Sequence, residues 1–268
     1  MRIPAAVLTL ALTLTGTSAG AIESRPLRVM SLDQCGDQYA LALAPEAELA
    51  LSPRADDPDS WMREAAAGHR RVRPTLEAAI GFQPDVVIRY WGGDARLLAR
   101  LEQGDVRVVN IADATNFDGI RRNIRTAASM LDVSPRGEAL IARMDARLSE
   151  AAPARVVRQR PALYLTAGGF TAGRGTLVDA ILGAAGLTNL VTNTGFGPVS
   201  VERIVRWRPA RFVLGFFDQS RGDWRGAGRH PALRAAAQGR VAARLPSASL
   251  TCPAWFAADA AAMLKTAG

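Results

Sequence analysis

The strongest constraint on the fold is an internal repeat that relates the two halves of the chain. In the first half Thr75 and Glu77 precede a Pro-containing turn and an apolar run, and in the second half Ser200 and Glu202 do the same. Each position of the second copy lies 125 residues after its partner. A hydroxyl side chain favours a helix start, and the helix dipole favours an acidic residue in the first turn. Each copy therefore predicts a short capped helix, a turn and a buried strand, and the repeat predicts two similar lobes.

One long helical pattern separates the two copies. Between residues 134 and 153, the side chains of Leu140, Ile141, Met144 and Leu148 fall on one stripe of a helix. The segment opens with a Ser-Pro pair, which is typical of a helix start, and it ends at a proline. This pattern predicts a helix that bridges the two lobes.

Apolar runs bounded by turn residues alternate with helical patterns in both halves, which is typical of an α/β fold with largely parallel sheets. The expected strands are residues 27–32, 49–51, 86–90, 106–111, 162–166, 212–216 and 241–245. The expected helices, besides the bridging helix, are residues 37–44, 76–81, 94–103, 116–131, 177–185 and 201–206. We predict two Rossmann-like α/β lobes, residues 22–133 and 154–268, bridged by a single long helix at residues 134–153, with a ligand cleft between the lobes.

Residues 1–21 have the features of a secretory signal peptide. Arg2 supplies a positive charge, an apolar stretch follows at residues 5–14, and small residues occupy positions 19–21. The apolar stretch is shorter than the ~20 residues of a membrane-spanning helix. We expect cleavage after Ala21 and a location in the periplasm. The alternative is an uncleaved N-terminal anchor.

The chain is basic, with a formal net charge of +8, which by itself favours nucleic-acid or membrane-surface partners. The basic residues do not support such a partner, because Lys265 is the only lysine and the arginines are scattered rather than clustered. We therefore expect a solvated arginine surface and no nucleic-acid partner.

Two cysteines and two histidines limit the metal chemistry of the chain. Cys35 and Cys252 lie far apart in a protein expected to be exported, where a disulfide can persist. The sequence leaves open a disulfide or two buried thiols, because it does not give the distance between the Cα atoms. His69 and His230 form no cluster with them at zinc-ligand spacing. We expect no metal site and no cofactor.

Several segments together resemble a known family. They are the lobe-one signature at residues 81–88, the aromatic-glycine loop at 90–93, the lobe-two segments at 171–176 and 186–190, and the closing segments at 230–233, 239–241 and 245–246. In this order and spacing they resemble the helical-backbone periplasmic binding proteins of the vitamin B12 and ferric-siderophore importers, above all the vitamin B12 binders. The likeness covers nearly all of the chain after residue 21.

The resemblance implies a receptor that binds its ligand between two nearly rigid lobes. The loops expected to line this cleft are rich in aromatic residues, which bury a large area with few rotatable bonds. The expected ligand contacts are Tyr90, Trp91, Phe170, Arg174, Phe196, Trp224 and Trp255. For each aromatic residue the alternative is packing within its own lobe. For Arg174, which could pair with a ligand phosphate or carboxylate, the alternative is a solvated surface position.

The family also implies a membrane partner, the permease of an ABC importer in the inner membrane. Members carry a glutamate at the crown of each lobe that meets permease arginines, and Glu77 and Glu202 match those positions. The alternative is that each carboxylate only complements its helix dipole. We expect a monomeric receptor.

Two other classes of protein fit the sequence less well. An enzyme has little support, because the nucleophile-elbow pattern at residues 16–20 lies in the signal segment and the glycine-rich loop at 168–176 has Arg174 where a phosphate-binding loop has lysine. A receptor for free metal ions needs more histidine and carboxylate ligands than the pattern offers. Among chelated ligands, residues 90–93 favour cobalamin over a ferric siderophore or heme, whereas the many arginines suit an anionic siderophore.

Overall fold

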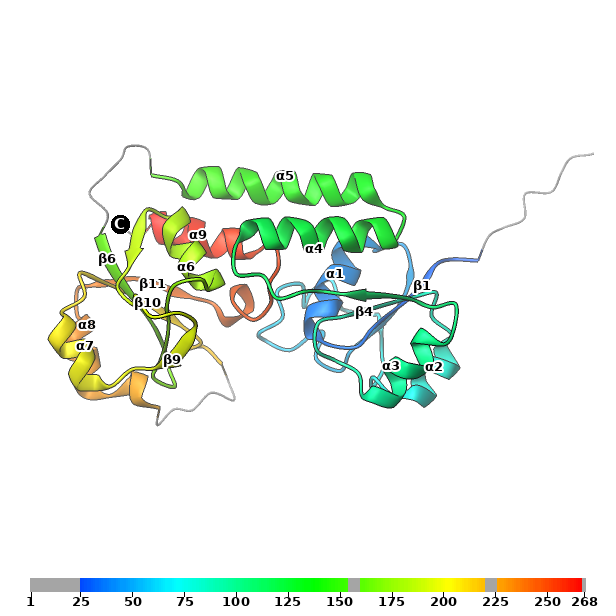
Figure 1. Ribbon diagram of the computed structural model, residues 1–268, viewed down its shortest axis with the longest axis horizontal. Coiled ribbons are helices and arrows are strands. Elements are labelled where there is room, and N and C mark those ends of the chain that lie inside the picture. The colour runs from blue at the N-terminus through cyan, green and yellow to red at the C-terminus, as the bar shows by residue number, and fades with distance from the viewer. Residues whose placement is uncertain (1–24, 154–159, 220–225, 267–268) are drawn as a thin grey trace, which may run out of the picture.

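The computed structural model describes residues 25–153, 160–219 and 226–266, and it shows two α/β lobes side by side beneath one long helix, α5 (Ser134–Ala151) (Figure 1). The predicted signal peptide and Trp224 lie outside the described residues. The predicted fold class is confirmed. No helix in the described part of the chain is both long and apolar enough to cross a bilayer.

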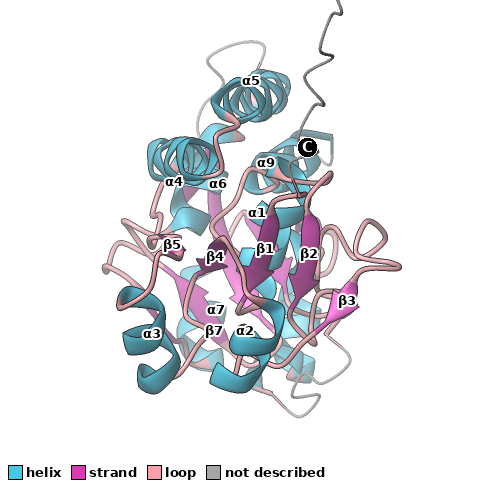
Figure 2. Ribbon diagram, turned by 90° about the vertical axis from the view of Figure 1, so that its right-hand side faces the viewer, coloured by secondary structure: helices cyan, strands magenta, loops and turns pink. Residues whose placement is uncertain are grey.

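The N-terminal lobe is built on a parallel five-stranded sheet with strand order β3-β2-β1-β4-β5. Its strands are β1 (Arg28–Ser31), β2 (Glu48–Leu51), β3 (Arg70–Arg71), β4 (Val86–Arg89) and β5 (Arg107–Asn110). Its helices are α1 (Gln34–Leu43), α2 (Leu76–Phe82), α3 (Ala95–Glu102) and α4 (Phe117–Met130). Figure 2 shows the sheet between α1 and α4 on one face and α2 and α3 on the other.

The C-terminal lobe has a parallel sheet of order β11-β10-β6-β8 and a small antiparallel sheet of β7 and β9. Its strands are β6 (Arg160–Thr166), β7 (Phe170–Ala172), β8 (Leu187–Asn189), β9 (Phe196–Pro198), β10 (Arg211–Gly215) and β11 (Val241–Leu245). Its α-helices are α6 (Leu177–Ala184), α7 (Val201–Trp207), α8 (Pro231–Ala237) and α9 (Ala257–Thr266). Two short 3-10 turns occupy Ala227–Arg229 and Ser247–Ser249.

The internal repeat is present in the fold. The order β8-β6-β10-β11 reproduces the order β2-β1-β4-β5 of the other lobe. The Thr75 hydroxyl accepts from the Ala78 N–H at the start of α2, and the Ser200 hydroxyl accepts from the Arg203 N–H at the start of α7, both at 3.2 Å. Both helices end at a residue in the left-handed region, Gln83 or Arg208. Equivalent sequence therefore produces equivalent helices in the two lobes.

The lobes share one hydrophobic core. The cluster that fills the face of each sheet toward α5 includes Tyr39 of the N-terminal lobe and Tyr164 of the C-terminal lobe. After β11 the chain returns to the other lobe, where Cys252 forms a disulfide with Cys35 and the Tyr39 hydroxyl donates to the Pro253 carbonyl at 2.8 Å. The lobes are therefore joined by α5, by this returning segment and by a covalent bond.

Candidate ligand cleft

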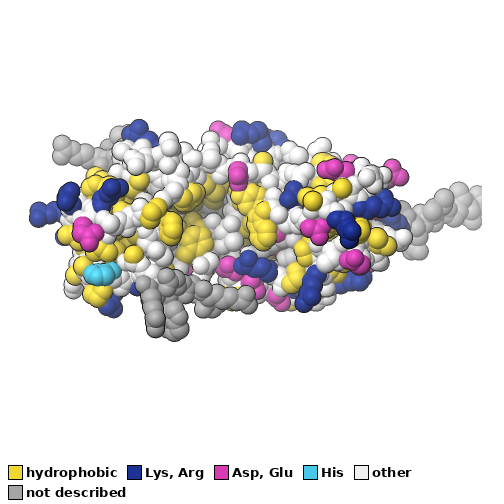
Figure 3. Space-filling model, turned by 60° about the horizontal axis from the view of Figure 1, so that its bottom comes forward, with side chains coloured by type: hydrophobic (Ala, Val, Ile, Leu, Met, Phe, Trp, Pro, Cys, Tyr) yellow, Lys and Arg dark blue, Asp and Glu magenta, His cyan; other side chains and the backbone are white. Residues whose placement is uncertain are grey.

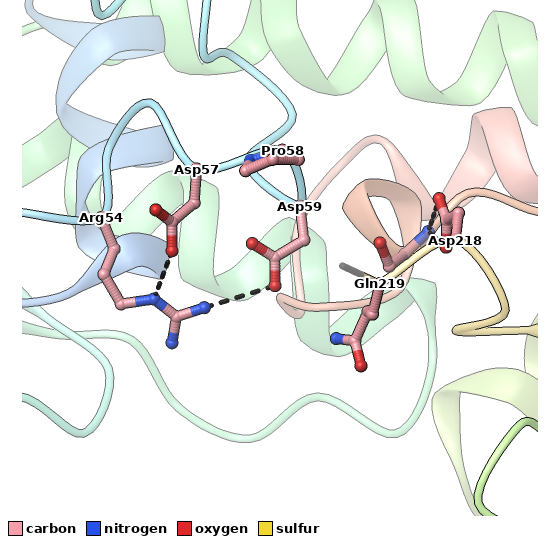
Figure 4. Close-up of a pocket in the computed structure, with 7 residues that line it drawn as sticks. Arg54, Asp57, Pro58, Asp59, Asp218 and Gln219 are labelled. Atoms are coloured by element: carbon pink, nitrogen blue, oxygen red, sulfur yellow. Dashed lines mark hydrogen bonds and ion pairs between the residues drawn. The ribbon is translucent and has the colours of Figure 1, made fainter. Parts of the chain in front are cut away.

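A pocket lies between the lobes, at the carboxyl ends of both parallel sheets (Figure 4). Its lining comes from the loop after β2, the loop after β10 and the turn after β11. These residues are Arg54, Asp57, Pro58, Asp59, Asp218, Gln219 and Ser247. We call this set the interlobe pocket. Ligand sites in open α/β sheets form at this edge of the strands, as the resemblance also implies.

The interlobe pocket is polar and rich in carboxylates. The Arg54 Nε donates to Asp57 Oδ2 at 2.8 Å, and its Nη2 donates to Asp59 Oδ2 at 3.3 Å. The hydrogen bond that Arg54 donates to Asp57 raises the pKa of Arg54, so this guanidinium stays charged. On the other side, both oxygens of Asp218 accept from the Ser247 N–H, at 3.1 and 3.0 Å. With three carboxylates and one guanidinium, the pocket favours ligand groups that donate hydrogen bonds.

The pocket is small, about 140 Å³. Sites that enclose drug-sized ligands have roughly 300–1,000 Å³. A large ligand would therefore also rest on the surfaces around the pocket. Figure 3 shows that apolar side chains gather around the hollow between the lobes.

Three of the predicted aromatic contacts are exposed, although none of them lines the interlobe pocket. Trp91 follows β4 and is 59% exposed, and Phe170 and Phe196 are 50% and 67% exposed. In the antiparallel register Phe170 pairs with Pro198 and Ala172 pairs with Phe196, so both phenylalanines project from the same face of this small sheet. The structure thus presents Trp91 on one lobe and a phenylalanine pair on the other. Their contact with a ligand stays a prediction.

Asp33, which the sequence analysis did not single out, fixes the loop that carries Trp91. This buried side chain follows β1, and its Oδ2 accepts from the N–H groups of Tyr90, Trp91 and Gly92 at 2.7, 2.9 and 2.7 Å. Its Oδ1 accepts from two N–H groups in the first turn of α1, at 3.0 and 2.9 Å. A Cβ atom at Gly92 would lie 2.2 Å from the Leu32 carbonyl oxygen, so only glycine fits there. An aspartate directly after a buried strand was the available signal.

Tyr90 is half-buried, and its hydroxyl donates to Asp113. Burial raises the pKa of Tyr90 to about 12, and the bond to Asp113 acts in the same direction. Arg174 is exposed, and its backbone forms an isolated bridge with Thr194 beside β9. Neither side chain lines the interlobe pocket, so their roles also stay predictions.

Trp255 lies at the lobe junction rather than on a free loop. Its ring makes edge contacts with Tyr39 at 5.6 Å and with Phe256 at 5.3 Å between ring centroids. Phe256 in turn stacks on Trp61 of the N-terminal lobe at 5.2 Å. Trp255 is partly exposed, and its contact with a ligand stays a prediction. Packing between the lobes accounts for much of its surface.

Glu77 and Glu202 are exposed in the first turns of α2 and α7. Hydrogen bonds from its own backbone N–H and from the Ser200 hydroxyl, with the charge of His230 nearby, hold the pKa of Glu202 below its usual value. Figure 1 shows α2 and α7 at opposite ends of the molecule, on the side away from α5. Two negative charges are thus presented on one side of the protein.

The question left open for the cysteines is answered by the structure, in which Cys35 and Cys252 are bonded with a Cα–Cα distance of 5.4 Å. Among the described residues, no three His, Cys, Asp or Glu side chains are grouped so that they could hold a metal ion. Two other cavities, of about 810 and 310 Å³, lie within the C-terminal lobe alone, under α8 and beside β9. The interlobe pocket differs from them in drawing residues from both lobes.

Comparisons with known proteins agree with this architecture. A family model described as periplasmic binding protein matches residues 40–215. A curated cobalamin-binding protein from Halobacterium salinarum is 27% identical over 207 residues, which cover 74% of this chain and 56% of the relative. The chain thus spans little more than half the length of that relative.

Solved structures share the fold. The periplasmic heme-binding protein of Vibrio cholerae has a TM-score of 0.72 at 17% identity, covering 90% of this chain and 98% of its own. A periplasmic heme-binding protein from Roseiflexus sp. RS-1 has a TM-score of 0.68 at 24% identity. The match covers 90% of this chain and 97% of that protein. The vitamin B12 binding protein of Vibrio cholerae has a TM-score of 0.59 at 18% identity. The match covers 90% of this chain and 96% of that protein. With two lobes, an interlobe pocket and a family match over most of its length, the chain belongs to the periplasmic binding protein family.

Proposed function

We propose that this protein is the periplasmic receptor of an ABC importer, which captures cobalamin or a related corrinoid and delivers it unchanged to the permease. The observation that carries the proposal is a carboxylate-lined pocket between two lobes, together with exposed aromatic side chains on each lobe. A broad ligand with an apolar face and polar edges suits this combination. The name of the curated Halobacterium relative supports the same ligand.

The charge of the pocket favours a corrinoid over heme or a ferric siderophore. A corrin ring carries amide side chains, whose N–H groups can donate to Asp57, Asp59 and Asp218. Heme carries two carboxylates and many ferric siderophores are anionic, so the same three carboxylates would repel them. The one guanidinium of the pocket is already bonded to two of these carboxylates.

Heme is the second candidate, favoured by the folds of the solved heme-binding proteins and by Tyr90. Heme iron needs an axial side chain such as His, Cys, Met or Tyr. Tyr39 and Tyr164 are buried, which leaves Tyr90 as the tyrosine near the cleft. Its raised pKa of about 12 opposes the tyrosinate form that binds iron. This candidate is therefore weaker than a corrinoid.

The deciding experiment is a titration of the purified protein with cyanocobalamin and, separately, with hemin, followed by tryptophan fluorescence. We expect saturable quenching by cyanocobalamin, after correction for its absorbance, and weak binding of hemin. Trp91→Ala is expected to reduce cyanocobalamin affinity about tenfold or more, because an exposed aromatic contact is lost. Trp207→Phe is the control, since Trp207 is the last residue of α7 and packs against the core of the C-terminal lobe. Tight hemin binding without cyanocobalamin binding would replace the corrinoid with heme.

We also propose export to the periplasm, with cleavage after residue 21, and a monomeric receptor. The support is the family match together with the N-terminal pattern of the sequence. N-terminal sequencing of protein recovered from the periplasmic fraction tests the cleavage position. An intact Met1 on the exported protein would contradict it.

A further inference from the structure

The larger of the two cavities in the C-terminal lobe lies between α8 and the face of the parallel sheet turned away from α5, and we call it the α8 pocket. Successive side chains of β10 point to opposite faces of the sheet. Val213 belongs to the core under α5, whereas Phe212 and Leu214 belong to the core on the other face. Helix α8 has seven residues and is about 10 Å long, so it covers that face only over a short length. A hollow of about 810 Å³ remains between helix and sheet.

The floor of the α8 pocket is apolar. Leu165, Leu214 and Leu233 line it, and each of them is at most 6% exposed. Val241 on β11 also lines it and is 37% exposed, so the hollow leaves an aliphatic side chain partly in solvent. Covering such surface is favourable, and the volume falls in the range of roughly 300–1,000 Å³ that is typical of small-molecule sites. The floor therefore suits the apolar body of a small ligand.

The rim of the α8 pocket is basic. Arg229, Arg234 and Arg244 line it, and no aspartate or glutamate does. Within the described residues, none of these three guanidiniums takes part in an ion pair. In the interlobe pocket, by contrast, the guanidinium of Arg54 is bonded to two carboxylates. The α8 pocket thus presents positive charge that the described part of the chain does not neutralise.

Two of these guanidiniums lie against one ring. The Cζ atoms of Arg229 and Arg244 are 5.1 and 5.9 Å from the centroid of the Phe217 ring. The Arg229 Nη2 donates to the Phe217 carbonyl at 3.0 Å, whereas its buried Nε has no hydrogen-bond partner among the described residues. Two like charges beside one ring repel each other, and an unpartnered buried donor costs free energy. An anion beside Phe217 would reduce the repulsion and accept from N–H groups that are still free.

We infer that the α8 pocket binds a small organic carboxylate with an apolar body, whose carboxylate pairs with Arg229 and Arg244 beside Phe217 and whose body rests on the leucines of the floor. A guanidinium can bind a carboxylate through two parallel hydrogen bonds, which favours this anion. The interlobe pocket has the opposite charge and would repel the same ligand. All residues of the α8 pocket belong to the C-terminal lobe, so the site needs neither a corrinoid nor closure of the lobes.

Isothermal titration calorimetry of the purified protein tests the inference, with octanoate, octan-1-ol and acetate as probes. We expect saturable octanoate binding with a dissociation constant below about 1 mM, and binding of the other two weaker by about tenfold or more. Octan-1-ol lacks the charge, and acetate lacks the apolar body. Raising the NaCl concentration from about 0.05 to about 0.5 M should weaken octanoate binding, because salt screens the guanidiniums.

Variants locate the site. Arg229→Gln and Arg244→Gln are each expected to weaken octanoate binding about tenfold, or about 1.4 kcal/mol. Arg206→Gln is the matched control, because Arg206 is an exposed arginine of the same lobe that does not line the α8 pocket. Arg244 is exposed, so Arg244→Gln is expected to keep the melting temperature of the parent protein and carries the test even where Arg229→Gln disturbs the fold.

Four outcomes would overturn the inference. Octanoate that does not bind saturably excludes the site. Equal affinity for octanoate and octan-1-ol removes the role of the arginines, and equal affinity for octanoate and acetate removes the role of the apolar floor. Octanoate binding that is unchanged in Arg244→Gln, or weakened as much in Arg206→Gln, places the ligand outside the α8 pocket.

Discussion

Asp33 is predicted to be the residue on which the loop at residues 90–92 most depends. Its carboxylate accepts five backbone N–H groups, two from the start of α1 and three from residues 90–92. In Asp33→Ala the loss of the helix cap costs about 1 kcal/mol. Each buried N–H left without a partner costs about 1–3 kcal/mol. Allowing the loop to recover some bonds to water, we expect the free energy of unfolding to fall by roughly 4 kcal/mol.

The same substitution is expected to weaken ligand binding, because the loop that presents Trp91 loses its anchor. Asp33→Asn should lower the free energy of unfolding and the ligand affinity nearly as much. Its amide nitrogen would face N–H donors in place of one carboxylate oxygen. Asp94→Ala is the matched control. Asp94 also caps a helix, but it accepts only one N–H, from Leu97 at 2.8 Å. Urea unfolding and cyanocobalamin titration measure both effects. If the free energies of unfolding of Asp33→Ala and Asp94→Ala differ by less than about 1 kcal/mol, and Asp33→Ala binds cyanocobalamin normally, the anchoring role of Asp33 is wrong.

Three further predictions concern the disulfide, a buried carboxyl and the ligand. Replacing Cys35 and Cys252 with alanine opens a loop spanning 217 positions, and the loop-entropy relation gives a loss of roughly 5 kcal/mol in urea unfolding; a loss below 1 kcal/mol would contradict it. Burial raises the pKa of Asp37 to about 6. The folded state therefore holds this proton more tightly, and the free energy of unfolding falls by up to roughly 3 kcal/mol as pH rises from about 4 to 6. Asp37→Asn should remove that fall, and parallel curves for both proteins would refute the assignment. Tyr90→Phe should leave cyanocobalamin binding intact, and a loss of hemin binding alone would reveal heme ligation.

The regular elements of the fold followed from the sequence where periodicity was clear. All seven expected strands and all seven expected helices are present, with ends that differ by at most three residues. Helix α9 was not predicted, because its alanine-rich residues are buried nearly all round and form no single apolar stripe. Strands β7 and β9 have three residues each, too few for a two-residue alternation to be recognised. Helix α8, of seven residues, was not among the expected helix ranges, although a proline after His230 is typical of a helix start.

The candidate site was predictable only in part. The aromatic residues stood out as residue types, but the polar lining did not, because Asp59 and Asp218 meet only once both lobes are folded. The disulfide could not be inferred, since nothing in the sequence shows that the chain after β11 returns to the other lobe. The position of Trp255 depends on the same return. These features are set by tertiary contacts between distant segments rather than by local pattern.

Because one hydrophobic core runs through both lobes, the two halves of this protein are not independent modules. A receptor whose halves met only at a linker could exchange one half for that of a relative and still fold. Here Tyr39 and Trp61 pack against residues that follow β11, so the chain boundary of each half does not coincide with its structural boundary. A chimera cut at α5 would leave each half with an apolar surface shaped for a partner it no longer has. Ligand specificity in this chain can therefore be exchanged only loop by loop.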